Sequence, residues 1–441
     1  RAYREHSWGF ESEPDDRGVS EPLLRGRLVG GTSWVTRFAM RGSPADFDLW
    51  ARLGNDGWAF DDVLPWFVRA ERDLDSGGLP WHGDAGPLPI TRYPEVAPSE
   101  YEVAVAAALA ANGFPTTDDH NRPGALGTGR MPRNGHDGRR VTAADALLPV
   151  DDAPANLHVR ADAEVDALLL DGATALGVRL VDGTEIRAGH VVLSAGTYGS
   201  PTILLRSGIG PADHLRDVGV PVHVDLPGVG ANLADHPGVD VDPGYRSDQD
   251  AGPRIFTLTT FHSSGHDTAE APDLALWTYD PFGEPAETTV DVLLLTPRSR
   301  GTVRLRSADP SAPPRITLPG LSDPADVDVL VEGYRRAYDV AAHAALRSVC
   351  AGAPPPLPAA VDQLGEQVRR TVGSFPHVVG TCAMGRDPGR GAVVDPYGGV
   401  HGVDRLSVVD ASIFPTAPSG FPHLISVMVA ERLADHLSRT L

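Results

Sequence analysis

His377 is the first residue whose setting suggests chemistry. The segment Ser-Phe-Pro-His-Val-Val-Gly-Thr (374–381) places an ionisable ring between a proline and an apolar run. Imidazole titrates close to neutral pH, so a histidine held in such surroundings can act as a general base. The chain has 16 histidines, however, and an isolated one is more often a core residue with satisfied ring nitrogens. The assignment therefore depends on what other segments bring to His377.

A second segment, residues 191–211, has the features of a ligand site. Residues 191–193 predict a buried strand, and a turn containing Ala195 and Gly196 follows it. Ser200 then opens a helix together with the proline after it. Free backbone N–H groups and the helix dipole would point at a phosphate or ribityl chain beyond the strand. The local sequence fits an ordinary strand-to-helix turn equally well.

Other chemistries find little support. The chain has no Gly-x-Ser-x-Gly motif of serine hydrolases and no His-Glu-x-x-His motif of zinc hydrolases. Asp118, Asp119 and His120 could ligate a metal, but we expect a solvated loop there and predict no metal site. The two cysteines, Cys350 and Cys382, lack a Cys-x-x-Cys spacing and cannot form a disulfide framework.

The composition indicates a globular protein with an acidic surface. Of 441 residues, 41% are hydrophobic and 22% charged, and the net charge is −21. Such a surface repels nucleic-acid phosphates and anionic lipids, so we expect neither as a partner. No apolar run of about 18 residues predicts a membrane-spanning helix. The chain opens like the middle of a protein, without an apolar signal core, and we expect a cytoplasmic location.

Local signals predict the elements that must position these residues. Ser43 and the following proline start one helix, and Ser99 with Glu102 forms a capping box for another that ends at Gly113. Two Asp-Gly pairs after residue 156 predict strands joined by tight turns.

Residues 240–375 predict an antiparallel sheet with helices against it, inserted as a second domain into the first. Residues 302–306 alternate between apolar and charged, and residues 322–346 form a capped amphipathic helix. The tail supplies a strand, a loop rich in Pro and Gly, and a final helix.

Several of these segments resemble the glucose–methanol–choline (GMC) oxidoreductases. Residues 196–210 match one signature of that family position for position. Residues 26–33 and 41–48 are similar to parts of its other signature. Residues 226–237 and 392–420 resemble the loop after the second signature and the C-terminal flavin-contacting segment. The resemblance covers essentially the whole chain in the family's order.

This resemblance implies an α/β fold of two domains. A doubly wound FAD-binding domain, discontinuous and without its first βαβ unit, would be formed by residues 1–60, 150–240 and 376–441. An antiparallel-sheet substrate domain with helices would be formed by residues 61–149 and 241–375.

The resemblance also implies FAD-dependent oxidation of an alcohol to an aldehyde or ketone. His377 occupies the position of the family's catalytic histidine, and His423 that of its second histidine or asparagine. His377 would take the hydroxyl proton, His423 would orient the hydroxyl, and hydride would pass to flavin N5. We expect the two rings to converge on one pocket. The cofactor-binding positions are then Val29, Gly30, Gly31, Thr32, Ser33, Val165, Ala195, Gly196, Ser200, Asp410, Ala411 and Leu424.

Two departures from the family bear on the cofactor. Residues 34–37 stand where members have an asparagine, or a histidine that some bond covalently to FAD, so we expect non-covalent FAD. The chain also lacks the Gly-x-Gly-x-x-Gly motif with which the family opens. Either the sequence is a fragment, or the segment is supplied upstream or in trans, or binding has been lost. We expect the 441-residue chain alone to be poorly stable and to bind FAD weakly.

The implied partners are an alcohol and an electron acceptor, which could be oxygen, a quinone or another carrier. Phe256, Phe261, Trp277 and Tyr279 would wall the pocket and favour hydrophobic or aryl alcohols over sugars. Two alternatives remain open. One is a hydroxynitrile-lyase-like flavoprotein without redox turnover, and the other is a non-catalytic relative that no longer binds FAD.

Overall fold

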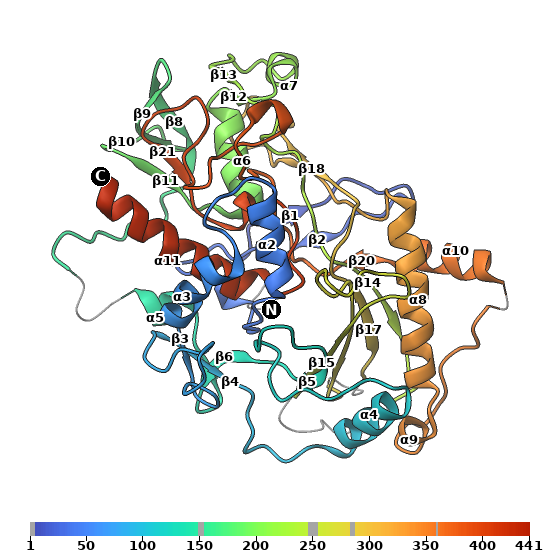
Figure 1. Ribbon diagram of the computed structural model, residues 1–441. Helices are drawn as coiled ribbons and strands as arrows, with labels where there is room; N and C mark the ends of the chain where they lie inside the picture. Colours follow the sequence, from blue (N-terminus) through green and yellow to red (C-terminus); the bar gives the residue numbers. More distant parts are fainter. Residues whose placement is uncertain (1–4, 149–153, 246–254, 283–286, 359) are drawn as a thin grey trace.

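The structure, a computed structural model, describes residues 5–148, 154–245, 255–282, 287–358 and 360–441. Figure 1 shows two groups of elements, each built around its own hydrophobic core. The first group contains α6, α11 and a small twisted sheet, and the second contains a larger sheet covered by a long helix. The site described below lies where segments of both groups meet.

The larger sheet is antiparallel and has six strands, in the order β20-β14-β17-β16-β15-β5. Helix α8 (Pro324–Ala341) packs across one face, where Asp323 caps it and a proline occupies its first turn. A Cβ at Gly333 would lie 2.5 Å from a methyl group of Val292, so glycine allows helix and sheet to approach closely. The strands are β5 Gly127–Arg130, β14 Pro237–Val241, β15 Phe256–Phe261, β16 Leu274–Tyr279, β17 Val290–Leu294 and β20 Gly373–Ser374.

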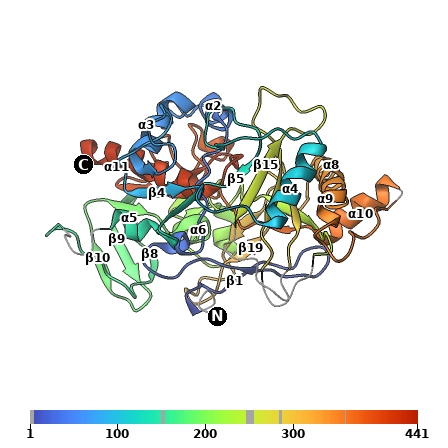
Figure 2. The same ribbon diagram turned by 90° about the horizontal axis from the view of Figure 1, so that it is seen from below.

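Alternation along the strands gives this sheet two different faces. Leu274 and Leu276 belong to the core under α8, whereas Ala275 and Trp277 pack on the opposite face. That opposite face carries an aromatic cluster and is the one turned toward His377. Figure 2 shows α4, α8 and α9 close together beside this sheet.

The parallel part of the fold is short. Strand β11 (Val191–Leu193) pairs in parallel with β21 (Leu406–Val408) and leads into α6 (Gly196–Arg206). Helix α6 begins at Gly196, four residues before the start expected at Ser200. Val192 is 43% exposed, so the expectation of a strand buried on both faces is wrong. The side chains at 191 and 193 face the core, and alternation turns Val192 outward.

The expected hairpins and helix caps are largely present. Strands β8 (Val165–Asp171), β9 (Thr174–Leu180) and β10 (Glu185–Arg187) pair antiparallel through the two Asp-Gly turns. Helix α2 (Pro44–Arg52) has a complete capping box, formed with Asp46.

The box expected at α4 (Glu100–Ala111) is only half formed. Ser99 Oγ accepts from the backbone N–H of Glu102, 3.0 Å away. The Glu102 carboxylate pairs with Arg130 instead of returning to the helix start.

Helices α3 (Phe60–Ala70) and α11 (Pro422–Thr440) pack together in the first core, which links residues 60–70 to the C-terminal segment. The domain boundaries drawn from the sequence remain a prediction.

Among the described residues, no helix combines the length and apolar character needed to cross a membrane. The remaining elements are β1 Phe10–Glu11, β2 Pro22–Leu23, η1 Gly31–Trp34, β3 Glu71–Asp73, β4 Leu88–Thr91, β6 Arg133–His136, β7 Arg139–Arg140, α5 Ala143–Leu147, β12 Ile209–Gly210, α7 Ala212–Asp217, β13 Val224–Asp225, β18 Thr302–Arg304, β19 Arg315–Thr317, α9 Ala344–Arg347, α10 Val361–Thr371, η2 Pro388–Arg390 and η3 Ala411–Ile413.

Candidate active site

His377 is hydrogen-bonded to a second histidine that the sequence reasoning did not select. The Nδ1 atoms of His236 and His377 are 3.0 Å apart, and Nε2 of His236 is 3.0 Å from the carbonyl oxygen of Pro418. A carbonyl oxygen only accepts, so Nε2 of His236 carries a proton. In the neutral ring Nδ1 then accepts, and Nδ1 of His377 must donate to it. This leaves the lone pair of neutral His377 on Nε2.

Asp235 holds the two histidine segments together. One oxygen of its buried carboxylate accepts the backbone N–H groups of His236, at 2.9 Å, and of His377, at 2.7 Å. The other oxygen accepts the hydroxyl of Ser374. Burial raises the pKa of Asp235 to about 6. The carboxylate therefore fixes the backbone, while the ring of His377 is oriented by His236.

The surroundings keep both rings neutral. Burial lowers the pKa of His236 to about 4. The pKa of His377 lies well below its usual value, chiefly because of burial and further because of His236 and Arg25. At pH 7 His377 is thus an unprotonated imidazole that can accept a proton.

Aromatic side chains surround the ring of His377. Its centroid lies 4.3 Å from that of Phe421 and 5.4 Å from that of Phe375. Trp277 packs against both, at 4.7 Å from Phe375 and 5.8 Å from Phe421. Phe256 joins this cluster, but Phe261 packs against Phe114 in the core under α8, so its expected place beside the substrate is wrong.

His423 occupies the first turn of α11, two residues after Phe421. Burial lowers its pKa to about 4, and the charge of Arg140 adds to the effect. Arg140 also donates to the carbonyl of Trp34, the last residue of η1. Among the described residues no hydrogen bond joins His377 and His423. Their convergence on one pocket remains a prediction.

The glycine-rich segment expected near a flavin forms a tight turn. Gly30 adopts a left-handed φ of 93° directly before η1. Ser33 Oγ donates to the carbonyl of Gly30 at 2.6 Å and accepts from the N–H of Ala143 at 3.1 Å. Thr32 Oγ1 accepts from an earlier glycine N–H. Val29 is 48% exposed and available to a ligand.

The start of α6 is occupied by a side chain of the protein. Asp410 Oδ2 accepts the N–H of Gly196 at 2.8 Å and the hydroxyl of Ser200 at 2.6 Å. This carboxylate takes the place at the helix N-terminus where the sequence suggested a phosphate. Ala195 is exposed just before it.

The remaining predicted positions are scattered along the first core. Val165 begins β8, Ala411 begins η3, and Leu424 is fully buried in α11. The contacts of all these residues with a cofactor remain a prediction.

Two buried polar atoms of this region are available for a hydrogen bond to a ligand. Nε2 of His423 and Nε1 of Trp277 have no hydrogen-bond partner within the part of the chain that the structure describes. An unsatisfied buried polar atom costs about 1–3 kcal/mol, so such atoms are rare in a protein core. Together with the exposed Val29, they fit a polar and partly aromatic group such as a flavin or its substrate.

Sequence comparisons identify the family. The N- and C-terminal family models described as GMC oxidoreductase match residues 19–238 and 297–430. The chain belongs to the GMC oxidoreductases. It is 37% identical to the 5-(hydroxymethyl)furfural oxidase of Methylovorus sp., with 93% of this chain and 82% of that protein aligned. It is 34% identical to an oxygen-dependent choline dehydrogenase of Sinorhizobium fredii, with 98% and 85% aligned.

Solved structures agree with this assignment. Pyridoxine 4-oxidase from Mesorbium loti superimposes with a TM-score of 0.90 at 28% identity, covering 98% of this chain and 89% of that one. A formate oxidase superimposes with a TM-score of 0.87 at 24% identity and supports the fold alone. The predicted family and α/β fold class are confirmed, and the chain is an FAD-dependent oxidoreductase of the GMC type.

This GMC oxidoreductase also buries a charge network, formed by Arg41, Glu71, Asp73, His82, Arg92 and Asp119. Arg41 and His82 both contact Glu71, and Arg92 bridges Asp73 and Asp119. His82 Nε2 lies 3.0 Å from Asp119. Three cationic groups thus face three carboxylates. Asp118 is exposed as expected, but Asp119 and His120 are buried, so the expectation of a solvated loop is wrong for these two residues.

Proposed function

We propose that this chain oxidises an alcohol to an aldehyde or ketone, with Nε2 of His377 accepting the hydroxyl proton. The hydrogen-bond chain from Pro418 through His236 to His377 carries this proposal, because it leaves the lone pair on the outer nitrogen of His377. A neutral imidazole with a low pKa is in the correct state to accept a proton at physiological pH.

The other residues of the site bind and orient. His423 has a buried, unpartnered Nε2 among the described atoms, and it would hold the substrate oxygen as the proton leaves. Phe375, Phe421 and Trp277 would exclude water from the reacting carbon. The alcohol loses its hydroxyl proton to His377 and its carbon-bound hydrogen as hydride, and the carbonyl product forms.

FAD, when bound, supplies the acceptor of that hydride. We place it beside the segment 29–33, the start of α6 and the first turn of α11. Residues 34–37 contain no histidine, which favours non-covalent FAD. Oxygen is the favoured electron acceptor, because two of the relatives are named an oxidase and an oxygen-dependent dehydrogenase.

Hydrophobic or aryl alcohols are the favoured substrates. Trp277, Phe375 and Phe421 offer ring faces next to His377. Two similar proteins, a 5-(hydroxymethyl)furfural oxidase and a pyridoxine 4-oxidase, are also named after aromatic alcohols. Turnover of glucose with none of benzyl alcohol would contradict this substrate class.

Anaerobic flavin reduction tests the proposal directly. Protein supplied with FAD is mixed with benzyl alcohol, and the bleaching of flavin absorbance is followed by stopped flow. We expect His377→Ala to slow bleaching by about 100-fold or more, because a positioned base is lost. His401→Ala, at a half-buried histidine bonded to Gly385, is the matched control.

Two outcomes would contradict this function. Unchanged bleaching in His377→Ala would make His377 a packing residue. Stable yellow protein that no alcohol bleaches would favour the hydroxynitrile-lyase-like alternative.

A further inference from the structure

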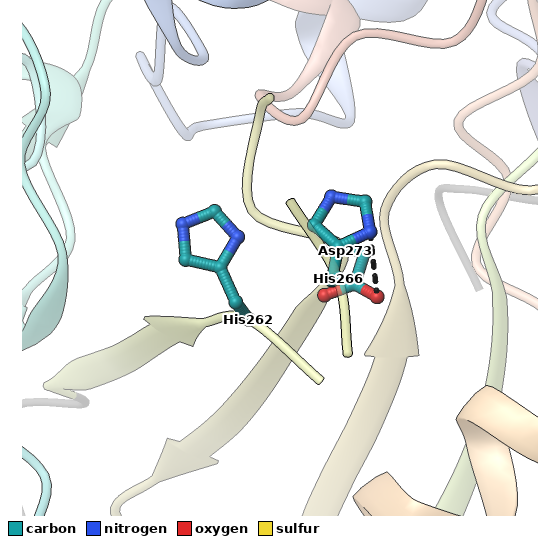
Figure 3. A group of neighbouring side chains, drawn as sticks. All are labelled: His262, His266 and Asp273. Carbon is teal, nitrogen blue, oxygen red and sulfur yellow. Dashed lines mark ion pairs between the residues drawn. The ribbon is translucent and has the colours of Figure 1, made fainter. Parts of the chain in front are cut away.

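A second histidine cluster lies in the turn between β15 and β16, outside the site described above. It consists of His262, His266 and Asp273 (Figure 3). One ring nitrogen of each histidine and one carboxylate oxygen lie within 4.8 Å of one another. The two rings are nearly parallel, with an angle of 20° and centroids 5.4 Å apart. Figure 3 shows one nitrogen of His262 facing His266.

The hydrogen bonds of His266 leave its Nδ1 facing a carboxylate. Its Nε2 lies 2.9 Å from the carbonyl of Ala271 and therefore carries a proton. In the neutral ring the Nδ1 lone pair then faces Asp273 Oδ2, 3.5 Å away. Two acceptors that face each other repel unless a proton or a metal ion lies between them. Asp273 is 2% exposed, so water does not screen that repulsion.

Asp273 and His262 are also arranged in a way that suits a metal ion. Ser263 donates its backbone N–H and its hydroxyl to Asp273 and fixes the carboxylate, as partners of metal-binding carboxylates do. Nδ1 of His262 is buried and has no hydrogen-bond partner in the described parts of the chain. The charge network around His82 differs from this cluster, because its carboxylates are already paired with Arg41 and Arg92.

We propose that His262, His266 and Asp273 bind one divalent transition-metal ion, with zinc as the best match. Two imidazoles and one carboxylate are a common zinc ligand set, and water would complete the tetrahedron. Bond lengths of about 2.0–2.2 Å place two donors of a tetrahedral ion roughly 3.3–3.6 Å apart. Nδ1 of His266 and Oδ2 of Asp273 already lie 3.5 Å apart, so the main adjustment is an approach of His262. Both histidines are half-buried rather than enclosed, so side-chain rotation allows this approach.

The ion would cross-link the two ends of the turn. His262 follows β15 directly and Asp273 precedes β16, so one metal ion joins both strands at the end where the turn connects them. Ser264 ties the same turn to Glu332 on α8 through two hydrogen bonds. The site is structural and independent of His377, and its test needs no turnover.

Metal binding to the purified chain tests this site. After treatment with a chelator, the protein is titrated with zinc chloride by calorimetry, and with cobalt to record the absorption of a tetrahedral ion. We expect one zinc per chain, and binding weakened by about tenfold or more in His262→Ala, His266→Ala and Asp273→Asn. His158→Ala, at an exposed histidine outside the cluster, should bind zinc like the wild type.

His262→Ala is the most informative variant, because no described hydrogen bond of its side chain is lost. Circular dichroism of each metal-free variant verifies its fold. If zinc binds the wild type no more tightly than the double variant His262→Ala, His266→Ala, the proposal is wrong.

Discussion

The His236–His377 pair and the charge network both bury histidines, yet their protonation states are opposite. At the pair, burial dominates and lowers the pKa of both rings. At His82 burial also opposes protonation, but hydrogen bonds to Asp119 and Glu71 outweigh it and raise the pKa. Burial alone therefore does not decide whether a histidine is a base or a structural cation; its partners do.

The two regions also differ in whether they leave a polar group available for reaction. Every charge of the network faces an opposite charge, and the network ties Arg41 to β3 and to Asp119. Asn121, next to Asp119, accepts from the N–H of Arg41 and donates to the carbonyl of Ala39. This fixes the segment that carries Phe38, whose ring packs 5.9 Å from that of Phe421. The charge network thereby supports the aromatic side chains that surround His377.

Breaking the charge network should have the largest effect on stability. Glu71→Gln removes the carboxylate shared by Arg41 and His82 and leaves buried charge uncompensated. We expect the free energy of unfolding to fall by about 3–5 kcal/mol, measured by urea denaturation. Glu164→Gln, at a solvent-exposed pair with Arg27, should have a far smaller effect. Equal losses in the two variants would show that the network is not a buried unit.

Removing His236 should affect rate more than stability. His236→Ala deletes the acceptor that keeps the Nδ1 proton on His377, so the lone pair is no longer confined to Nε2. We expect flavin reduction to slow by about 10- to 100-fold, less than on loss of the base itself. His236→Asn, whose amide oxygen can accept the same proton, should recover part of the rate. Unchanged reduction and pH profile in His236→Ala would remove its role as a positioning residue.

The pH dependence of stability should separate the two regions further. The pKa of His82 is raised on folding, so its contribution is complete below about 6.5 and is lost as pH rises through the folded value. The penalty of His82→Gln should therefore shrink as pH rises above that value. Urea denaturation of both proteins between about pH 6 and 9 measures it. A penalty independent of pH would indicate lost packing rather than lost charge pairing.

Local sequence signals predicted the parts of the fold that depend on neighbours along the chain. The cap at Ser43, the capped helix expected over residues 322–346 and the Asp-Gly turns follow from side chains within a few residues. His377 was identified by family resemblance. His236 was missed although an Asp-His pair before a proline was visible, because its contact with His377 exists only when β14 pairs with β20.

The charge network was missed for a related reason. Its members come from separate segments, and isolated charged residues such as Asp119 resemble a solvated surface until their partners are known. The capping box at α4 is only half formed for a similar reason, because the Glu102 carboxylate pairs with Arg130 on β5. At this helix a tertiary ion pair replaces a local capping contact.

The central claim is that neutral His377, with its lone pair on Nε2, accepts the substrate proton. The most direct test is the pH dependence of the anaerobic flavin-reduction rate at saturating benzyl alcohol, with FAD-supplied protein. Because the pKa of His377 lies well below its usual value, we predict a rate independent of pH above about 6.5 that falls only at lower pH. A rate that keeps rising between about pH 7 and 9 would contradict the account, since the base would then be a group with a higher pKa.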